Sequence, residues 1–349
     1  MGAVSWLREG VGIHANYSRG FRVPNMTDLG TVGLQGNGVY ETAFADLAGR
    51  GALLGDRADE QARSTGRAPE RLRPEVTNNF DVGVRLRRGR WEAEVTRVWL
   101  NLENSIVSHT LLLPAGAVGH ALGEQTIARQ LESGAVFVPI STAPVLVRGN
   151  FSGARMRGWE QRLRVQLTKD WSVSENLTSI TARDAITGRP PDIEPGVPPL
   201  TVNLVVAWRP AGGRFWVEAY ATLADRQERL SSLALSDRRI GNPRSRANIQ
   251  SFFQNGARVR GVVRDGILLP TGETLGQVQR RVLGGASSAP QFTAIAGYGL
   301  VGLRGGMSVG ENTDVSFDLT NLGDKNYRGI GWGVDGAGRA WTVQLRRRF

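Results

Sequence analysis

Residues 341–349 read WTVQLRRRF, and this stretch decides the fold. Its apolar side chains, Trp341, Val343, Leu345 and Phe349, alternate with polar ones, and only Arg347 breaks the alternation. Successive side chains of a β-strand point to opposite faces, so the stretch predicts a strand with one apolar and one wet face. Such a strand fits the lipid-exposed wall of an outer-membrane barrel, and it fits a half-buried strand of a soluble sandwich equally well.

The composition removes several classes of protein. The 349 residues include 45 glycines and 15 prolines, too many for a helical bundle, and no cysteine, which excludes disulfides, thiol nucleophiles and Cys-ligated metals. No apolar run approaches the roughly 20 residues of a transmembrane helix. A membrane protein with this sequence would therefore have to cross as a closed β-barrel.

The charge is strongly basic, with a formal net value of +11. Arginine supplies almost all of it, since Lys169 and Lys325 are the only lysines among 43 basic residues. The arginines are spread along the chain and often alternate with apolar residues. This distribution indicates a polar, Arg-lined inner wall with basic loops rather than a surface that binds nucleic acid.

About ten segments alternate in this way and predict an all-β, antiparallel up-and-down transmembrane barrel. They cover residues 4–17, 76–87, 91–104, 159–167, 171–183, 199–209, 214–224, 291–304, 313–320 and 341–349. In 91–104 the apolar face changes sides after Val95, and a bulge near Thr96 and Arg97 would restore it. The stretches 18–75, 105–154 and 225–290 lack sustained periodicity and are predicted to be loops.

The connections between these strands alternate in length. Short ones at 88–90, 169–170, 210–213 and 305–312 separate longer ones, so all the short turns are expected on one rim. Bacterial outer-membrane barrels have this asymmetry, whereas a sandwich has no reason to segregate its loops by length. Aromatic residues at strand ends, such as Tyr17, Trp91, Trp171 and Trp208, fit interfacial girdles and also fit a soluble core.

Six segments occur in the order, and at offsets, similar to those of one known family. They are YSRGFRVPNMTDL (17–29), LRPEVTNNFDVGVRL (72–86), GWEQRLRVQL (158–167), VPPLTVNLVVAW (197–208), FDLTNLGDKNYR (317–328) and GRAWTVQLRRRF (338–349). On these segments the chain resembles the TonB-dependent receptors of the Gram-negative outer membrane. The resemblance implies a 22-stranded barrel around an amino-terminal plug, on which a TonB-type coupling protein pulls to admit a siderophore, haem, cobalamin or similar ligand.

The departures from that pattern set the expected extent of the chain. Residues 1–349 read as barrel, with about ten strands and neither a plug, a coupling box nor a signal peptide. We expect the carboxy-terminal half of a 22-stranded barrel, with unpaired edges at 4–17 and at the assembly strand 341–349, and no gated transport by the chain alone. The expected partners are outer-membrane lipid and lipopolysaccharide, the plug, the missing amino-terminal strands, the coupling protein and a small-molecule ligand, with neither a cofactor nor nucleic acid.

Apparent catalytic motifs carry little weight. GxGxxG at 297–302 lies inside an alternating strand without a following helix, and GxSxG at 306–310 reads as a turn with no histidine after it. His109 and His120 lie in the second long loop, where we expect them to be solvated. The alternative function is an autonomous ten-stranded outer-membrane enzyme of the protease or phospholipase type, which would need serine, histidine or carboxylate groups clustered at one rim.

The loop 225–290 is the candidate ligand-contact region. Between 226 and 281 it carries eleven arginines and four acidic residues, a net charge of +7. Arginine pairs well with phosphate and carboxylate groups, so Arg238, Arg239, Arg244 and Arg246 are candidate contacts for lipopolysaccharide phosphates or an anionic ferric chelate. A solvated basic loop explains the same composition.

Overall fold

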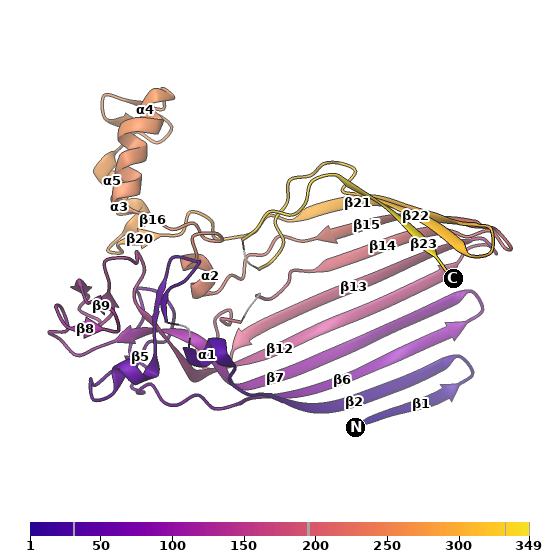
Figure 1. Ribbon diagram of the computed structural model, residues 1–349, viewed down its shortest axis with the longest axis horizontal. Helices are drawn as coiled ribbons and strands as arrows, with labels where there is room; N and C mark the ends of the chain where they lie inside the picture. Colours follow the sequence, from indigo (N-terminus) through magenta and orange to yellow (C-terminus); the bar gives the residue numbers. More distant parts are fainter. Residues whose placement is uncertain (31, 194–195, 332, 349) are drawn as a thin grey trace.

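One large curved sheet dominates the molecule (Figure 1). The computed structural model describes residues 1–30, 32–193, 196–331 and 333–348. The main strands follow one another in the order β1-β2-β6-β7-β12-β13-β14-β15-β21-β22-β23, which is also their order along the chain. Every neighbouring pair along this path is antiparallel, so the up-and-down topology expected from the sequence is confirmed.

The main strands have the following bounds: β1 Gly2–Arg8, β2 Val11–Arg22, β6 Glu75–Arg88, β7 Trp91–Leu112, β12 Leu146–Gln166, β13 Trp171–Asp184, β14 Thr201–Trp208, β15 Phe215–Ala224, β21 Tyr298–Val309, β22 Thr313–Thr320 and β23 Ala340–Arg347. Short strands lie in the loops: β3 Gly33–Leu34, β4 Tyr40–Thr42, β5 Leu53–Leu54, β8 Ala121–Leu122, β9 Gln125–Thr126, β10 Arg129–Gln130, β11 Val136–Phe137, β16 Arg244–Ser245, β17 Val263–Arg264, β18 Ile267–Leu268, β19 Glu273–Thr274 and β20 Ser288–Ala289. The helices are α1 Met26–Gly30, η1 Phe44–Leu47, α2 Ser232–Ser236, α3 Arg246–Ser251, the π-helix η2 Phe252–Gly256, α4 Ala257–Val259 and α5 Leu275–Leu283. No helix in the described part of the chain is long and apolar enough to span a membrane.

The two faces of the sheet differ in chemistry, as the alternation predicts. On β12, Leu163 and Val165 share one face, while Arg162 and Arg164 line a concavity on the other. On β23, Trp341, Val343 and Leu345 are 74%, 60% and 69% exposed on the apolar face. We call the apolar face the outer face and the polar, concave one the inner face.

All short turns gather at one end of the sheet, and the long loops emerge from the other (Figure 1). The expected segregation of loop lengths is therefore confirmed. One short turn was not predicted from the sequence. The single strand expected at 4–17 is two strands, β1 and β2, with only Glu9 and Gly10 between them. Gly10 adopts a φ of +75°, which a glycine reaches without steric cost and which allows so tight a turn.

The expected bulge near Thr96 and Arg97 is wrong. Pairing of β7 with both of its neighbours runs without a shift through these residues, so Arg97 shares the outer face with Trp91 and Val95. The register between β7 and β12 instead shifts nearer the loops, between the pair Gly149–Val107 and the pair Ala154–Leu102. Consequently the apolar residues 98, 100 and 102 lie on the inner face.

Other boundaries also moved. β7 continues to Leu112 and β12 begins at Leu146, so part of the stretch 105–154 is strand rather than loop. The strand expected at 291–304 lies at Tyr298–Val309, which places the GxSxG segment 306–310 mostly in β21 rather than in a turn. The strands expected at 171–183, 199–209, 214–224 and 313–320 are confirmed within two residues at each end.

Aromatic side chains form two rows on the outer face. Near the short turns, Trp208 contacts Trp171 and Phe215, with ring centroids 6.3 and 5.2 Å apart. Toward the loops, Tyr17, Phe80 and Trp99 are consecutive cross-strand partners, and the last two rings lie 5.6 Å apart. Trp91 and Trp99 on β7 are separated by roughly 20 Å along the normal if the strand tilts by about 40°. That spacing suits the interfacial girdles of a membrane barrel.

The sheet is open at both sides. Within the described residues β1 pairs only with β2, and β23 pairs only with β22; they lie at opposite edges of the sheet (Figure 1). The first edge is thus β1 alone rather than the whole of 4–17. Phe349, the last residue of the expected assembly strand, lies outside the described residues.

A candidate ligand-binding site at the long-loop rim

The long loops pack into a layer with its own hydrophobic core. The extensions of β7 and β12 beyond the sheet supply its floor, and β4, β5 and β11 pack on them. The core residues are Tyr40, Leu47, Ala52, Leu54, Leu111, Leu113, Ala117, Leu122, Ile127, Val136, Val138, Val145 and Val147. A packed layer of this kind holds polar side chains at the rim in fixed positions.

Loop 55–64 ties the long loop 225–297 to this layer. The Glu60 carboxylate accepts hydrogen bonds from the backbone N–H groups of Ser287 and Ser288, at 2.8 and 3.1 Å, and from the Ser287 hydroxyl. On the same loop, the Ala58 N–H donates to Oγ of Ser232 at 3.0 Å. Two segments more than 170 residues apart in the chain therefore meet at one place.

A cavity of about 490 Å³ lies between these segments, and we call it the rim cavity. Arg57, Arg238 and Arg244 contribute to its lining, together with Asp59 and Glu60. Its other lining residues are Gln61, Thr142, Ala143, Pro144, Ser232, Leu235, Ser236, Asn242, Pro243, Ser245, Asn248, Ser288, Ala289 and Pro290. The cavity thus carries three cationic and two acidic groups, and its other lining residues are neutral.

Two of the three arginines have no carboxylate partner among the described residues. Arg238 donates from Nη2 to Oγ1 of Thr142 at 3.3 Å, and Arg244 donates from Nε to Oε1 of Gln291 at 2.9 Å. Arg57, in contrast, lies 3.6 Å from a carboxylate oxygen of Asp59. Arg238 and Arg244 therefore keep their charge available for an anionic ligand.

The structure separates the four arginines that the sequence singled out. Arg238 and Arg244 line the rim cavity. Arg239 pairs through Nε and Nη2 with both oxygens of Asp237, at 3.1 and 2.8 Å, and lines a different cavity. Arg246 lies on α3 and donates to Oε1 of Gln279 at 3.0 Å. Only the first pair is placed to act together on one ligand.

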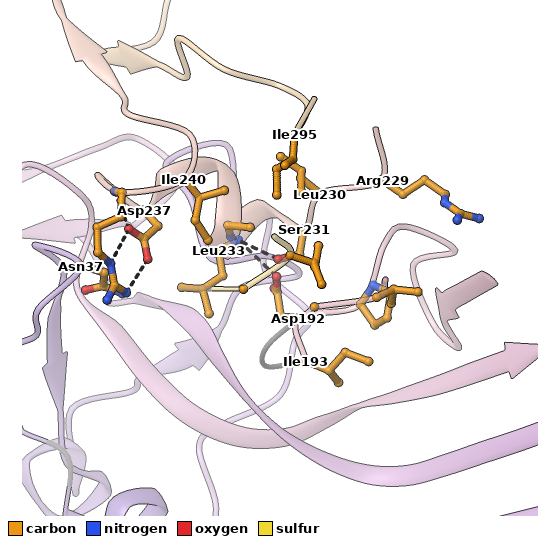
Figure 2. Close-up of a pocket in the computed structure, with 17 residues that line it drawn as sticks. Asn37, Asp192, Ile193, Arg229, Leu230, Ser231, Leu233, Asp237, Ile240 and Ile295 are labelled. Carbon is orange, nitrogen blue, oxygen red and sulfur yellow. Dashed lines mark hydrogen bonds and ion pairs between the residues drawn. The ribbon is translucent and has the colours of Figure 1, made fainter. Parts of the chain in front are cut away.

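A second, smaller cavity lies beside α2 and is shown in Figure 2. Asp192 points at the start of α2, where its carboxylate accepts from the Ser232 hydroxyl at 3.3 Å and the Leu233 N–H at 3.2 Å. Burial raises the pKa of this carboxyl from 3.8 to about 6, against the opposing effect of the hydrogen bonds from Ser231, Leu233 and Ser232. Burial likewise raises the pKa of Asp59 above its usual value, opposed by the nearby Arg57.

The raised pKa of Asp192 predicts that the stability of its contacts with the start of α2 depends on pH. The ionised carboxyl is less favourable in the folded loop than in the unfolded chain, so this contribution to stability is greatest below about pH 4 and falls as the pH rises through about 6. In the unaltered chain, we expect the free energy that stabilises this loop to differ by on the order of 1–2 kcal/mol between the two pH values, a figure that already allows for some solvent contact of the carboxyl. Asp192→Asn keeps an acceptor oxygen but does not ionise, so we expect it to abolish this difference. Hydrogen–deuterium exchange of residues 229–237 at about pH 5 and about pH 7.5 measures this, and an unchanged pH response in the variant would contradict it.

The histidines and the described acidic groups assemble no metal site. His109 is buried, at 5% exposure, and its Nδ1 lies 2.9 Å from the carbonyl oxygen of Gly55, so the expectation of a solvated side chain is wrong for this residue. His120 is exposed, as expected. Among the described residues no group of three or more His, Asp or Glu side chains is placed to hold a metal ion.

The inner face carries a charged concavity of about 790 Å³ near the short turns. Arg85 and Glu94 are paired across β6 and β7 at 3.0 Å, and Glu218 on β15 accepts from both Arg209 and Arg304. The alternation of the strands predicts this polar wall in general terms. Neither these pairs nor the contribution of Arg57 and Asp192 to the rim could be found from the sequence, since each depends on contacts between distant segments.

Comparisons with known proteins agree with this architecture. The family model described as "TonB dependent receptor-like, beta-barrel" matches residues 2–322. No curated protein sequence matches the chain. Among solved structures, the siderophore receptor PirA from Acinetobacter baumannii is similar with 17% identity and a TM-score of 0.55, over 99% of this chain and 40% of that one. The copper transporter OprC gives 15% identity and a TM-score of 0.54, over 97% of this chain and 37% of that one.

A third similar structure is a mutant of the ferric enterobactin receptor PfeA from Pseudomonas aeruginosa. It has 16% identity and a TM-score of 0.53, over 100% of this chain and 39% of that one. At these identities the likeness shows the fold, and the chain spans well under half the length of each of these receptors. On the family match over residues 2–322, the chain belongs to the TonB-dependent receptors, within their β-barrel domain.

Proposed function

We propose that the chain is a section of the barrel wall of a Gram-negative outer-membrane receptor, and that its rim cavity captures an anionic small ligand for energy-coupled uptake. The observation that carries the ligand proposal is the pair Arg238 and Arg244, which face one cavity without carboxylate partners among the described residues. The outer face, apolar between two aromatic rows, supports a position in the membrane.

The ligand class that fits best is a ferric chelate with catecholate or carboxylate groups. Two guanidinium groups on one cavity can each give two parallel hydrogen bonds to such oxygens. The similar structures include a siderophore receptor and a ferric enterobactin receptor, which makes this class the first to test. We assign no cofactor, and the proposed role is transport rather than catalysis.

The open edges support a receptor that needs further strands. Unpaired backbone N–H and C=O groups of β1 and β23 would each cost several kcal/mol in hydrocarbon, so partner strands must cover them in a membrane. The same openness disfavours the autonomous ten-stranded enzyme, which would close on itself. The remaining proposed partners are a plug that fills the charged concavity on the inner face and a TonB-type protein that acts through it.

Binding of a ferric tris-catecholate siderophore to the complete receptor tests the ligand proposal. We expect Arg238→Gln combined with Arg244→Gln to weaken binding at least roughly tenfold, because each charge-assisted contact is worth about 1.5–3 kcal/mol. The matched control is Arg258→Gln combined with Arg260→Gln, which removes the same charge from exposed residues of the same loop that do not line the cavity.

Equal losses in the two double variants would show that only the net charge of the loop matters, and would contradict the cavity as the binding site. Unchanged binding in the Arg238 and Arg244 variant would remove it outright.

A further inference from the structure

An arginine cluster lies on the outer face of the sheet, on the side of the loops. Arg155, Arg157 and Arg183 belong to β12 and β13, and Arg97 belongs to the neighbouring β7. The register places them together: Arg155 is the direct partner of Arg183, Arg157 that of Trp99, and Arg97 that of Trp159. All four share the face of Leu163 and Val165, so they point away from the polar concavity.

None of these four arginines forms an ion pair with a carboxylate in the described part of the chain. Arg155, Arg157 and Arg183 are exposed. Like charges directly opposite on neighbouring strands destabilise a sheet. The pairing of Arg155 with Arg183 therefore destabilises the sheet locally, and a bound anion would offset this repulsion.

The aromatic row fixes the depth of this cluster relative to the membrane. The guanidinium of Arg97 lies 4.8 Å from the ring centroid of Trp159 and 5.5 Å from that of Trp99. Arg157 pairs directly with Trp99, and Arg155 and Arg183 are one further step toward the loops. Tryptophan rings of a girdle lie at headgroup depth, so the arginines reach the level of lipid phosphates.

Two acidic residues share the outer face with the cluster, Glu103 and Glu175. Glu103 lies on β7, two residues beyond Asn101, which is the partner of Arg155, and its Oε1 accepts from Nδ2 of Asn78 at 3.4 Å. Glu175 accepts a hydrogen bond from Nε2 of Gln161 at 3.0 Å. It pairs with Leu163, four residues nearer the short turns than Trp159, and has no ion pair with Arg97. Four arginines outnumber the one carboxylate beside them, Glu103, so the cluster remains cationic.

We propose that Arg97, Arg155, Arg157 and Arg183 form a binding site for the phosphate groups of an outer-leaflet glycolipid, on the outside of the barrel wall. Arginine forks match phosphate oxygens in bidentate geometry, and the apolar face below the cluster accommodates acyl chains. The site is separate from the rim cavity, and it rests on the proposed function in that the outer face must contact lipid.

Lipid retention by the full chain, isolated from outer membranes in a non-ionic detergent, tests this site by native mass spectrometry. The probes are diphosphorylated lipid A and the same glycolipid without phosphates. The test variant is Arg155→Gln combined with Arg157→Gln. Its matched control, Arg162→Gln combined with Arg164→Gln, removes the same charge from the same strand at the same spacing, but from the inner face.

We expect the outer-face variant to retain the diphosphorylated lipid roughly tenfold less well, and the inner-face control to stay within about twofold of the unaltered chain. The dephosphorylated lipid should bind weakly and equally to all three. Equal loss in both variants, equal binding of both lipids, or displacement of the lipid by millimolar inorganic phosphate would each overturn the proposal.

The proposed membrane location is tested separately, by fractionation of the expressed chain. A chain that is absent from outer membranes contradicts the proposed function. A chain that is present there but shows no phosphate-dependent difference between the variants contradicts the lipid site alone.

Discussion

Leu303→Arg is expected to prevent stable insertion of the chain, whereas Leu300→Arg, three residues away on the same strand, is expected to be tolerated. Leu303 lies on the outer face of β21 between Ala219 and Leu319, and Leu300 pairs with Thr222 on the inner face. Arginine on the lipid face near the bilayer midplane costs roughly 2–4 kcal/mol, but in a wet lumen it costs little. Both variants add the same side chain in place of the same residue.

The amount of each variant in purified outer membranes, and its heat-modifiable gel mobility, measures this difference. Equal insertion of the two variants would show that the faces do not differ in solvent, which is incompatible with a membrane barrel.

Glu218→Gln is expected to lower the free energy of unfolding by about 2–3 kcal/mol. Glu218 is 5% exposed and accepts from Nη2 of Arg209 at 2.6 Å and from Nε of Arg304 at 2.7 Å. Removing its charge leaves the guanidinium groups of Arg209 and Arg304 close together without a carboxylate between them. The arginines themselves are 61% and 45% exposed, so solvent screening keeps the loss below that of a fully buried pair.

Urea titration followed by tryptophan fluorescence measures this effect, because the guanidinium of Arg209 lies 4.9 Å from the ring centroid of Trp216. Arg209→Gln is the control: it leaves Glu218 paired with Arg304, and we expect it to cost less than half as much. A control that destabilises as strongly as Glu218→Gln would contradict the central role assigned to this carboxylate.

The strands with one wet and one apolar face were predictable from the sequence. β13, β14, β15 and β22 alternate with a period of two because their two faces differ in polarity. The same reasoning gave the segregation of short turns and long loops, since consecutive antiparallel strands must turn at opposite ends. These features depend on local sequence alone.

The missed features lack that local signal. Residues 106–112 of β7 are buried on both faces by the loop core, so they show no alternation and read as irregular. The first hairpin could not be predicted because β1 lacks a clear alternation: Val4, Trp6 and Leu7 place apolar side chains on both of its faces. The bulge expected at Thr96 rested on the assumption that every apolar residue faces outward, whereas Leu100 and Leu102 lie inside.

The candidate site was only partly predictable, because it joins distant parts of the chain. The arginine content indicates the loop that contains Arg238 and Arg244. The sequence does not show that Arg239 forms an ion pair with Asp237, or that Arg246 donates a hydrogen bond to Gln279. Arg57 comes from another loop altogether. The sequence does not place Arg155 and Arg157 on a strand, because the alternation that predicts β12 begins only at Trp159.

We propose that one face of the sheet contacts lipid and the other contacts water, and β14 allows the most direct test. The absence of cysteine from the sequence allows single cysteines to be introduced and spin-labelled one at a time along β14, Thr201–Trp208, in the membrane-inserted protein. We predict that labels at 202, 204 and 206 are accessible to lipid-soluble oxygen, and that labels at 203, 205 and 207 are accessible to a water-soluble nickel chelate. Accessibility to the two reagents that does not alternate along the strand would contradict the account.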